Sequence, residues 1–238
     1  MNTPAVPKLI SQTPCTLLTG FLGSGKTTLL NSLLALKPAK ERWALLINEF
    51  GQIGIDAGLI DAPNVNSSDV NSTVINNIGS NRHSTVNSTG INNIGPNRHS
   101  TNHKEAKIAI REVSGGCICC TSQLPLQIGL SRLLAEHHPQ RLLIEPTGLA
   151  HPRTLLAQLS EPHWQTSLLL KSVICVLSGQ QWSQGKYRHH EGYQAHVIHA
   201  DFIAINRFEQ LSVTEIEDLN LWLAKLNPAA ELLWLPAP

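Results

Sequence analysis

The stretch GFLGSGKTT, residues 20–28, indicates which fold this chain adopts. Its spacing is G-x-x-x-x-G-K-T, between the apolar run CTLLT at 15–19 and a helical pattern of leucines at 29, 30, 33 and 34. In a strand–loop–helix setting, successive backbone N–H groups and the helix N-terminus point at bound phosphate. We therefore predict a phosphate-binding loop. The alternative is a glycine-rich turn with an exposed Lys26.

The side chains of this loop have expected roles at a nucleoside triphosphate. Lys26 would reach the β- and γ-phosphates, and the Thr27 hydroxyl would ligate Mg²⁺. Other contacts would come from backbone N–H groups, because glycines let the backbone wrap a phosphate closely. The predicted nucleotide-binding set in this loop is Gly20, Gly23, Ser24, Gly25, Lys26, Thr27 and Thr28.

A second apolar run also ends in residues that suit a phosphate site. LLIEPTG, at 142–148, ends its strand-like part in Glu145, which would make a second Mg²⁺ contact, usually through water. Gly148, three residues on, would sense the γ-phosphate. We assign catalysis to Lys26, Thr27 and Glu145.

A third run, FIAINRFE at 202–209, ends in residues that suit a base site. Asn206, Arg207 and Glu209 are similar to the guanine-reading pattern N-K-x-D, with both charged positions changed. A carboxylate there accepts hydrogen bonds from guanine N1–H and N2–H₂, which adenine lacks, and Arg207 can stack on the base. We expect GTP as the nucleotide, with an ATP-using protein as the alternative.

Composition narrows the class of partner. The 238 residues are 42% hydrophobic and 15% charged, with a net charge of +1, which is typical of a globular protein. No Lys/Arg run suggests nucleic acid or an anionic membrane surface as a partner. No apolar run approaches the roughly 20 residues that span a bilayer, and the N-terminus does not resemble a signal peptide. We expect a cytoplasmic protein with a single domain over 1–238.

Short apolar runs alternate with helical patterns, which is typical of βαβ units. One helix is predicted over Leu124–Ala135, and another through Ile216–Leu226 opens with the capping-box pair Ser212 and Glu215. The predicted fold is α/β, of the P-loop NTPase type, with a mostly parallel, doubly wound sheet and helices on both faces. The candidate strands are Cys15–Thr19, Trp43–Asn48, Lys107–Val113, Arg141–Glu145, Ser172–Leu177 and Asp201–Asn206.

Residues 62–104 interrupt this alternation and are rich in Asn, Ser and Thr. VNSTVINNIGSNRHST, at 70–85, is followed directly by VNSTGINNIGPNRHST, at 86–101. Two copies cannot make a solenoid, which needs about three or more units to bury a core. We expect a disordered surface insertion, and the alternative is a histidine-bearing loop that feeds metal to the protein.

GGCICC, at 115–120, holds three of the five cysteines within four positions. Neighbouring cysteines strain to form a disulfide, and the cytoplasm keeps thiols reduced. A soft divalent ion could instead take Cys117, Cys119 and Cys120 as ligands, with a coordination position left open for its release. The alternatives are a redox pair and inert buried cysteines.

The expected position of these thiols connects them to the nucleotide. They lie between the strand Lys107–Val113 and the helix Leu124–Ala135, and therefore at the same strand-to-helix edge as the phosphate loop. Metal and nucleotide would be neighbours. A change at the γ-phosphate could then alter the metal ligands directly.

Taken in order, the motifs resemble those of CobW-type GTPases, relatives of the urease and hydrogenase nickel-accessory GTPases. GFLGSGKTTLLN, INEFGQIGID, GGCICC, EPTG and NRFE carry the resemblance, which covers about 15–228 apart from the insertion. It implies a GTPase that loads or delivers a transition metal, commonly Zn²⁺ or Co²⁺, through the C-x-C-C thiols. It also places Glu49 and Asp56 in the first switch segment, where Asp56 is the better candidate to sense Mg²⁺ or the metal.

The leading hypothesis is a GTP-dependent metallochaperone that serves an unidentified client metalloprotein. The alternative is a nucleotide-responsive metal-binding module with little or no catalysis. Two departures from the family pattern support the alternative: the usual C-terminal domain is expected to be absent after Pro238, and Ser178 stands where relatives tend to have Asp. A metal shared across a nucleotide-dependent homodimer is a further hypothesis.

A group of histidines lies near the fourth strand–helix unit. His189, His190, His196 and His199 are expected on a solvated helix face, and the alternative is that they assist metal capture.

Overall fold

A computed structural model gives the fold of this chain, and it describes residues 12–47, 60–61, 107–113 and 124–236. The chain divides into two compact units, and every described residue belongs to the unit formed by 1–63 and 105–238. The other unit, 64–104, lies outside the described residues, so the expected disorder of the insertion stays a prediction. None of the helices in the described part has the length and hydropathy needed to cross a membrane.

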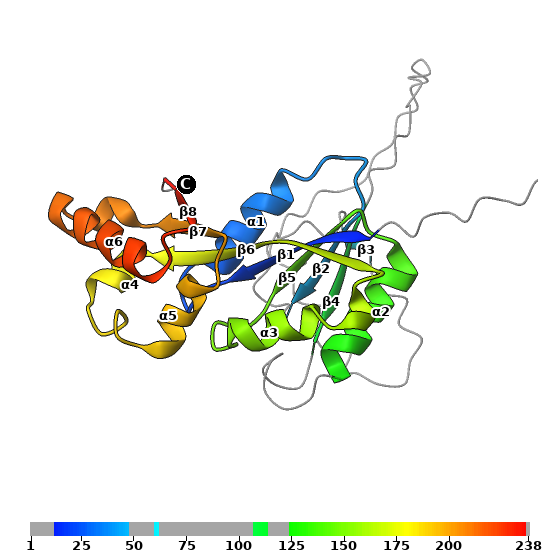
Figure 1. The fold of residues 1–238 in the computed structure, drawn as a ribbon. Coiled ribbons are helices and arrows are strands. Elements are labelled where there is room, and N and C mark those ends of the chain that lie inside the picture. The colour runs from blue at the N-terminus through cyan, green and yellow to red at the C-terminus, as the bar shows by residue number, and fades with distance from the viewer. Residues whose placement is uncertain (1–11, 48–59, 62–106, 114–123, 237–238) are drawn as a thin grey trace, which may run out of the picture. The chain divides into compact units, whose positions relative to one another are not determined.

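The described residues form one sheet of eight strands, and every pair of neighbouring strands is parallel (Figure 1). The strands are β1 (Thr13–Thr19), β2 (Trp43–Ile47), β3 (Ile60–Asp61), β4 (Ile108–Glu112), β5 (Arg141–Glu145), β6 (Leu168–Ser178), β7 (Phe202–Asn206) and β8 (Glu231–Trp234). Their order across the sheet is β3-β4-β2-β5-β1-β6-β7-β8. The strand that leads into the phosphate loop, β1, therefore lies between β5 and β6.

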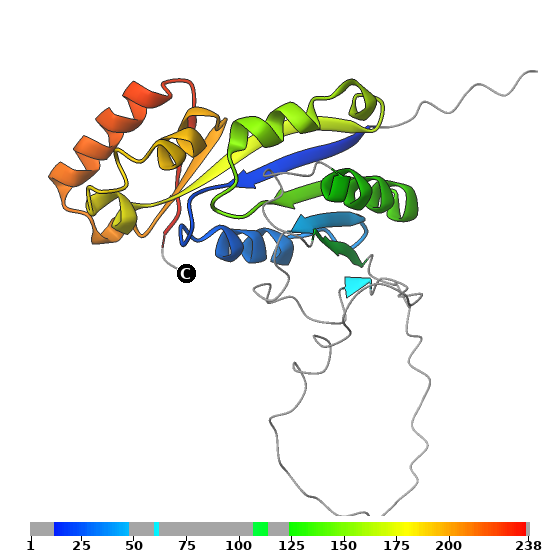
Figure 2. The ribbon, with the colours of Figure 1, turned by 90° about the horizontal axis from the view of Figure 1, so that it is seen from below.

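Helices cover both faces of this sheet. In the described residues the α-helices are α1 (Lys26–Ala35), α2 (Leu124–His137), α3 (Pro152–Leu159), α4 (Gly179–Ser183), α5 (Glu191–Ile198) and α6 (Val213–Leu226), and the short 3-10 helices are η4 (Pro162–Trp164) and η5 (Phe208–Gln210). α1 lies on one face, and α2 and α3 lie on the other (Figures 1 and 2). The predicted α/β fold with a doubly wound parallel sheet is therefore confirmed.

β2 shows how one strand serves both faces. All five of its residues are buried, and Ala44 and Leu46 pack with leucines of α2 and α3. Leu45, between them, packs with Leu30 and Leu34 of α1. A strand that is buried on both faces has a continuous apolar sequence, and for this reason WALLI at 43–47 is typical of a parallel sheet.

The strand predictions are correct for six strands and miss two. β5 has the predicted bounds, and β6 begins at Leu168, four residues before the predicted start at Ser172. β8 was not predicted because ELLW at 231–234 is only partly buried and lies at the edge of the sheet, where the apolar pattern is weak. β3, with two residues, is too short for any periodicity to indicate.

The helix predictions hold at their N-termini. α2 begins at Leu124, as predicted, and runs two residues past the predicted end. The predicted capping box of α6 is present: the Ser212 side chain accepts a hydrogen bond from the Glu215 N–H, and Glu215 Oε2 accepts one of 2.9 Å from the Ser212 N–H. This satisfies two backbone donors that would otherwise lack an intrahelical partner.

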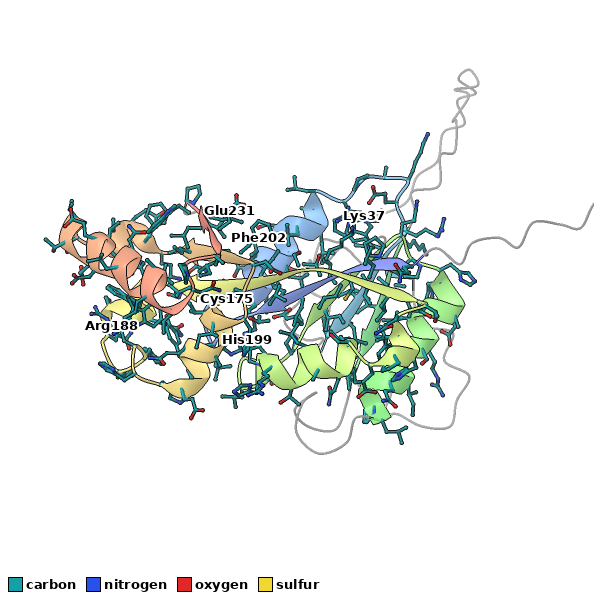
Figure 3. All side chains as sticks on the ribbon, in the orientation of Figure 1. Lys37, Cys175, Arg188, His199, Phe202 and Glu231 are labelled. Carbon is teal, nitrogen blue, oxygen red and sulfur yellow. The ribbon has the colours of Figure 1, made fainter. Side chains whose placement is uncertain are left out.

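The registers bring the carboxyl ends of the central strands to one edge of the sheet. Ile47 of β2 pairs with Glu145 of β5, and Ser178 of β6 pairs with Asn206 of β7. Cys175, labelled in Figure 3, pairs with the last residue of β1 and is buried. In open α/β sheets ligands bind outside these carboxyl ends, close to the strand where the order of the sheet reverses, which here is β1.

Candidate functional site

A pocket of about 300 Å³ lies at this edge of the sheet. Its walls come from the loop between β1 and α1, the end of β2, the loop after β5 and the residue after β7. The lining residues are Leu22, Gly23, Gly25, Lys26, Thr27, Thr28, Ile47, Glu145, Pro146, Thr147, Gly148 and Arg207. The structure therefore brings residues from four of the sequence motifs to one pocket.

The loop needs glycine where it enters α1. Gly25 is the N-cap of the helix and has φ 98°, a left-handed conformation that side chains other than glycine rarely adopt. A Cβ atom there would also lie 2.5 Å from Asn206 Nδ2. That amide donates a hydrogen bond of 2.8 Å to the Ser24 carbonyl, so the end of β7 helps to hold the loop in shape.

Lys26 is buried at the base of the pocket. Its Nζ donates hydrogen bonds to the carbonyl oxygens of Gly20, at 3.0 Å, and Phe21, at 3.3 Å. Burial lowers the pKa of the Lys26 amine, and the nearby Glu145 carboxylate opposes that shift. The lysine is thus a buried donor of hydrogen bonds, held by the loop that would wrap a phosphate.

Thr27 and Glu145 meet across the pocket. Thr27 Oγ1 donates a hydrogen bond of 3.0 Å to Glu145 Oε1. Burial raises the pKa of the Glu145 carboxyl, while the hydrogen bond from Thr27 and the charge of Lys26 act in the opposite direction. A hydroxyl and a carboxylate side by side are the oxygen donors that Mg²⁺ prefers in proteins.

Gly148 packs directly against the phosphate loop. A Cβ at this position would overlap the backbone of Leu22 and Phe21, so the glycine allows a backbone contact that no larger residue could make. On its other side the Gly148 carbonyl lies 3.4 Å from His196 Nε2 of α5. The loop after β5 is therefore held between the phosphate loop and a helix.

The three residues of the predicted base motif have different surroundings. Asn206 contacts the phosphate loop through Ser24, and Arg207 lines the pocket. Arg207 also has a left-handed backbone, with φ 50°, at the start of η5. Glu209 lies in η5, is exposed and does not line the pocket. Sequence reasoning thus predicted a group that the structure brings together only in part.

Two residues that position the loop had no signal in the sequence. The Phe21 ring makes edge contacts with Tyr187, His190 and Tyr193, at centroid distances of 5.7, 5.0 and 5.7 Å. The Gln181 side-chain amide donates a hydrogen bond of 2.8 Å to the Leu22 carbonyl. Both contacts join segments that are more than 150 residues apart, and no local pattern could have indicated them.

The prediction of a solvated histidine face is wrong for one residue. His196 is only 2% exposed, because its position on α5 faces the loop after β5 rather than solvent. His189 and His190 are exposed, as expected, and the His190 ring nitrogen Nδ1 caps α5 by accepting a hydrogen bond from the Tyr193 N–H at 3.3 Å. His199, labelled in Figure 3, is partly buried at the end of α5.

The predicted metal ligands lie outside the described residues. These are Cys117, Cys119, Cys120, Glu49 and Asp56. Within the described part of the chain, no group of three or more His, Cys, Asp or Glu side chains is placed to hold a metal ion. Of the predicted metal ligands, Thr27 alone lies within the described residues, where its hydroxyl donates to Glu145.

A larger hollow, of about 1050 Å³, lies at the opposite ends of the strands. Thr13, Gln140 and Trp164 are among the residues that line it, and it includes none of the phosphate-loop residues. The chemistry of the motifs, rather than the volume of a cavity, identifies the functional edge.

Comparison with known proteins also indicates a nucleotide-binding domain. The family model described as CobW/HypB/UreG, nucleotide-binding domain, matches residues 14–233. The zinc chaperone YeiR of Escherichia coli (strain K12) is 32% identical over 206 residues, which cover 87% of this chain and 50% of that protein. The zinc chaperone CobW of Pseudomonas aeruginosa is 24% identical over 245 residues, which cover 94% and 56%. This chain spans about half the length of these curated relatives.

A solved structure shares the fold. The crystal structure of the Zn(II)-bound YjiA GTPase from E. coli superposes with a TM-score of 0.57 at 22% identity. The match covers 93% of this chain and 57% of that one.

Proposed function

The chain belongs to the CobW/HypB/UreG nucleotide-binding domain family, and from this premise we propose that it binds and hydrolyses GTP to control a transition metal. One observation carries the nucleotide part of the proposal: Lys26, the Thr27–Glu145 pair and Gly148 surround a single pocket. The metal part rests on the C-x-C-C thiols and on relatives whose names describe zinc chaperones.

The phosphates would bind to the loop between β1 and α1. The buried Lys26 ammonium would exchange the carbonyls of Gly20 and Phe21 for β- and γ-phosphate oxygens. The N-terminus of α1 begins at the same residue, so its free backbone N–H groups also favour an anion there. Gly148 N–H would contact the γ-phosphate from the loop after β5.

Mg²⁺ suits the oxygen atoms that meet in this pocket. The Thr27 hydroxyl would ligate it, and the Glu145 carboxylate would contact it, usually through water. When bound, the ion would neutralise negative charge between the β- and γ-phosphates. Thr27 would then give up its present hydrogen bond to Glu145 and offer its oxygen to the ion.

Hydrolysis would follow the course common to phosphate-loop enzymes. A water molecule attacks the γ-phosphorus, the bond from that phosphorus to the β–γ bridging oxygen breaks, and GDP and inorganic phosphate leave. Lys26 and the loop N–H groups would stabilise the charge that moves onto the bridging oxygen. The residues of this chain therefore act mainly by placement and charge.

The cargo would be Zn²⁺ or Co²⁺, held by the thiolates of Cys117, Cys119 and Cys120. The segment that carries them joins β4 to α2, and β4 is parallel to β2, which is itself parallel to β5. A loop that follows β4 leaves the sheet at the edge where Glu145 lies, which supports coupling between metal and nucleotide. Three thiolates leave one position open, as transfer to a client metalloprotein requires.

A second candidate function has an observation in its favour. Ser178 is buried and caps α4 by accepting a hydrogen bond from the Gln181 N–H, and Glu209 does not line the pocket. Both are positions where the chain departs from the family pattern. They favour a metal-binding module that responds to nucleotide with little catalysis. Single-turnover hydrolysis of GTP separates the two, because the module would cleave none with zinc, cobalt or nickel present.

The main experiment compares GTP hydrolysis with and without Zn²⁺ or Co²⁺. We expect metal to change the rate in the unmodified protein, and Cys119→Ala to lose that response while it still binds GTP. Lys26→Ala is the reciprocal variant, which should retain metal but lose the nucleotide. An unaltered metal response in Cys119→Ala would count against the thiol site.

Two further measurements test the partners. Competition between GTP and ATP tests the base motif, and a preference for ATP would overturn the role of Glu209. Sizing of the protein with GTP plus metal tests the nucleotide-dependent homodimer. Metal content with GDP and with a non-hydrolysable GTP analogue tests whether the nucleotide state sets metal affinity.

A further inference from the structure

One helix outside the pocket contacts two of the loops that form it. The N-terminal turn of α5 brings Tyr193 and the capping residue His190 against Phe21 of the phosphate loop. Near its C-terminus the same helix brings His196 to the Gly148 carbonyl. α5 therefore spans the distance between the two loops that would contact phosphate, and no sequence motif indicated this connection.

In the hydrogen bond between His196 and the Gly148 carbonyl, only the imidazole can be the donor. A carbonyl oxygen only accepts hydrogen bonds, so the imidazole must carry its proton on Nε2, which lies 3.4 Å from that oxygen. The other nitrogen, Nδ1, is buried and has no hydrogen-bond partner among the described residues. This arrangement suits a neutral imidazole with the Nε2–H tautomer.

The surroundings of His196 keep the ring neutral. Burial lowers its pKa to about 4, and electrostatic interactions with Lys26, His151 and His199 act in the same direction. The hydrogen bond to Gly148 opposes this shift. At neutral pH the side chain is thus a fixed donor of one hydrogen bond, rather than a charge.

The opposite side of Gly148 leaves its loop little freedom. A Cβ atom there would overlap the backbone of Leu22, so the glycine lies in direct contact with the phosphate loop. The loop after β5 is clamped between that backbone and His196. A small displacement of the Gly148 carbonyl would be transmitted to the peptide that carries the N–H expected at the γ-phosphate.

We infer that His196 is a positioning residue that fixes the Gly148 loop through its Nε2–H, and that it thereby sets the preference of the pocket for GTP over GDP. This inference rests on the proposed function. Buried polar side chains usually make hydrogen bonds, so a histidine at this core position indicates a role beyond filling space. If His196 only filled space, any residue of similar volume would serve as well.

The test compares two variants of similar size. His196→Gln keeps an N–H near the position of Nε2, whereas His196→Leu removes the donor and leaves the carbonyl unpaired. His189→Ala, an exposed histidine just before α5, is the control. Affinities for GDP and for a non-hydrolysable GTP analogue are measured with Mg²⁺ by calorimetry.

We expect His196→Leu to reduce the preference for the GTP analogue over GDP by about threefold to tenfold, the effect of one net hydrogen bond. Affinity for GDP should stay within about twofold, and His196→Gln should resemble the unmodified protein. Equal losses for both nucleotides, or equal effects of Leu and Gln, would overturn the positioning role.

A nucleotide-free measurement keeps the inference separate from the proposed function. Two-bond ¹⁵N–¹H spectra of the histidine rings should show His196 as the neutral Nε2–H tautomer at pH 6 and above. A cationic ring or the Nδ1–H tautomer there would overturn the inference. If the unmodified protein bound neither nucleotide, the proposed function would fail, and these spectra would still decide whether His196 holds Gly148.

Discussion

Thr27 Oγ1 donates a hydrogen bond of 3.0 Å to Glu145 Oε1, and this bond joins the first turn of α1 to the end of β5. The two residues are 118 positions apart in the chain. They meet because β1 and β5 are parallel neighbours, so the loops that follow them leave the sheet at one edge. The pair therefore arises from sheet topology, and its atoms are those that an Mg²⁺ site would use.

The first prediction concerns the hydroxyl of Thr27. Thr27→Ala should weaken Mg²⁺-dependent binding of GTP by about tenfold to a hundredfold, because it removes a ligand to a charged group. Thr27→Ser keeps the oxygen and should stay within about threefold. Ser32→Ala removes an exposed hydroxyl of the same helix, which donates a hydrogen bond to the Thr28 carbonyl, and serves as the control. Titration with a fluorescent GTP analogue measures all three variants.

The second prediction concerns the stability of the free protein. Because burial raises the folded-state pKa of Glu145 above 4.5, its stabilising contribution is complete below that pH and is lost as pH rises through the folded pKa. The Glu145→Gln side chain does not titrate, so it loses no stability as pH rises, and it still accepts the hydrogen bond from Thr27. Its free energy of unfolding should therefore exceed that of the unmodified protein at pH 7, by a margin that shrinks toward pH 4.5.

Urea unfolding at a series of pH values measures that margin. The same variant should hydrolyse GTP at least about tenfold more slowly, because the amide carries no charge to place Mg²⁺. A variant that is less stable than the unmodified protein at pH 7 would contradict the prediction.

The sequence predicted those parts of the site that lie near the carboxyl end of a strand. Glu145 and Asn206 end β5 and β7, Lys26 begins the helix that follows β1, and a parallel sheet collects its carboxyl ends at one edge. A local strand pattern is sufficient for this prediction, because in a parallel sheet it indicates both the strand and the edge of the sheet at which the following loop lies. For this reason the sequence alone predicts that the phosphate loop and the Gly148 loop lie at the same edge of the sheet.

The sequence could not predict contacts made between side chains of distant elements. His196 was expected on a solvated helix face, but the crossing of α5 over the loop after β5 buries it. Phe21 occupies an x position of G-x-x-x-x-G-K-T, which indicates no role for its side chain, although its ring contacts three others. The burial of His196 and the ring contacts of Phe21 both depend on tertiary packing, which produces no periodic pattern in the sequence.

The third prediction concerns Phe21. Phe21→Ala should lower the free energy of unfolding by about 2 kcal/mol, since the partly buried ring loses its contacts with Tyr187, His190 and Tyr193. Affinity for GTP should fall as well, because the Phe21 ring contacts help to hold the phosphate loop in shape. Phe21→Leu should lose about half as much stability. Leu36→Ala, at a leucine that is 77% exposed, should change the unfolding free energy by less than about 0.5 kcal/mol.

The last prediction concerns acid. The folded-state pKa of His196 is lowered from 6.5 to about 4, so the unfolded chain binds more protons between these values. The stability that this residue contributes is complete above pH 6.5 and is lost as pH falls toward 4, by about 3 kcal/mol in total. His196→Gln does not titrate, and its unfolding free energy should fall less over this range by up to that amount.

Urea unfolding from pH 7.5 to 4.5 measures the difference. Parallel profiles for the variant and the unmodified protein would contradict a neutral, buried His196. His189→Ala, at an exposed histidine, serves as the control.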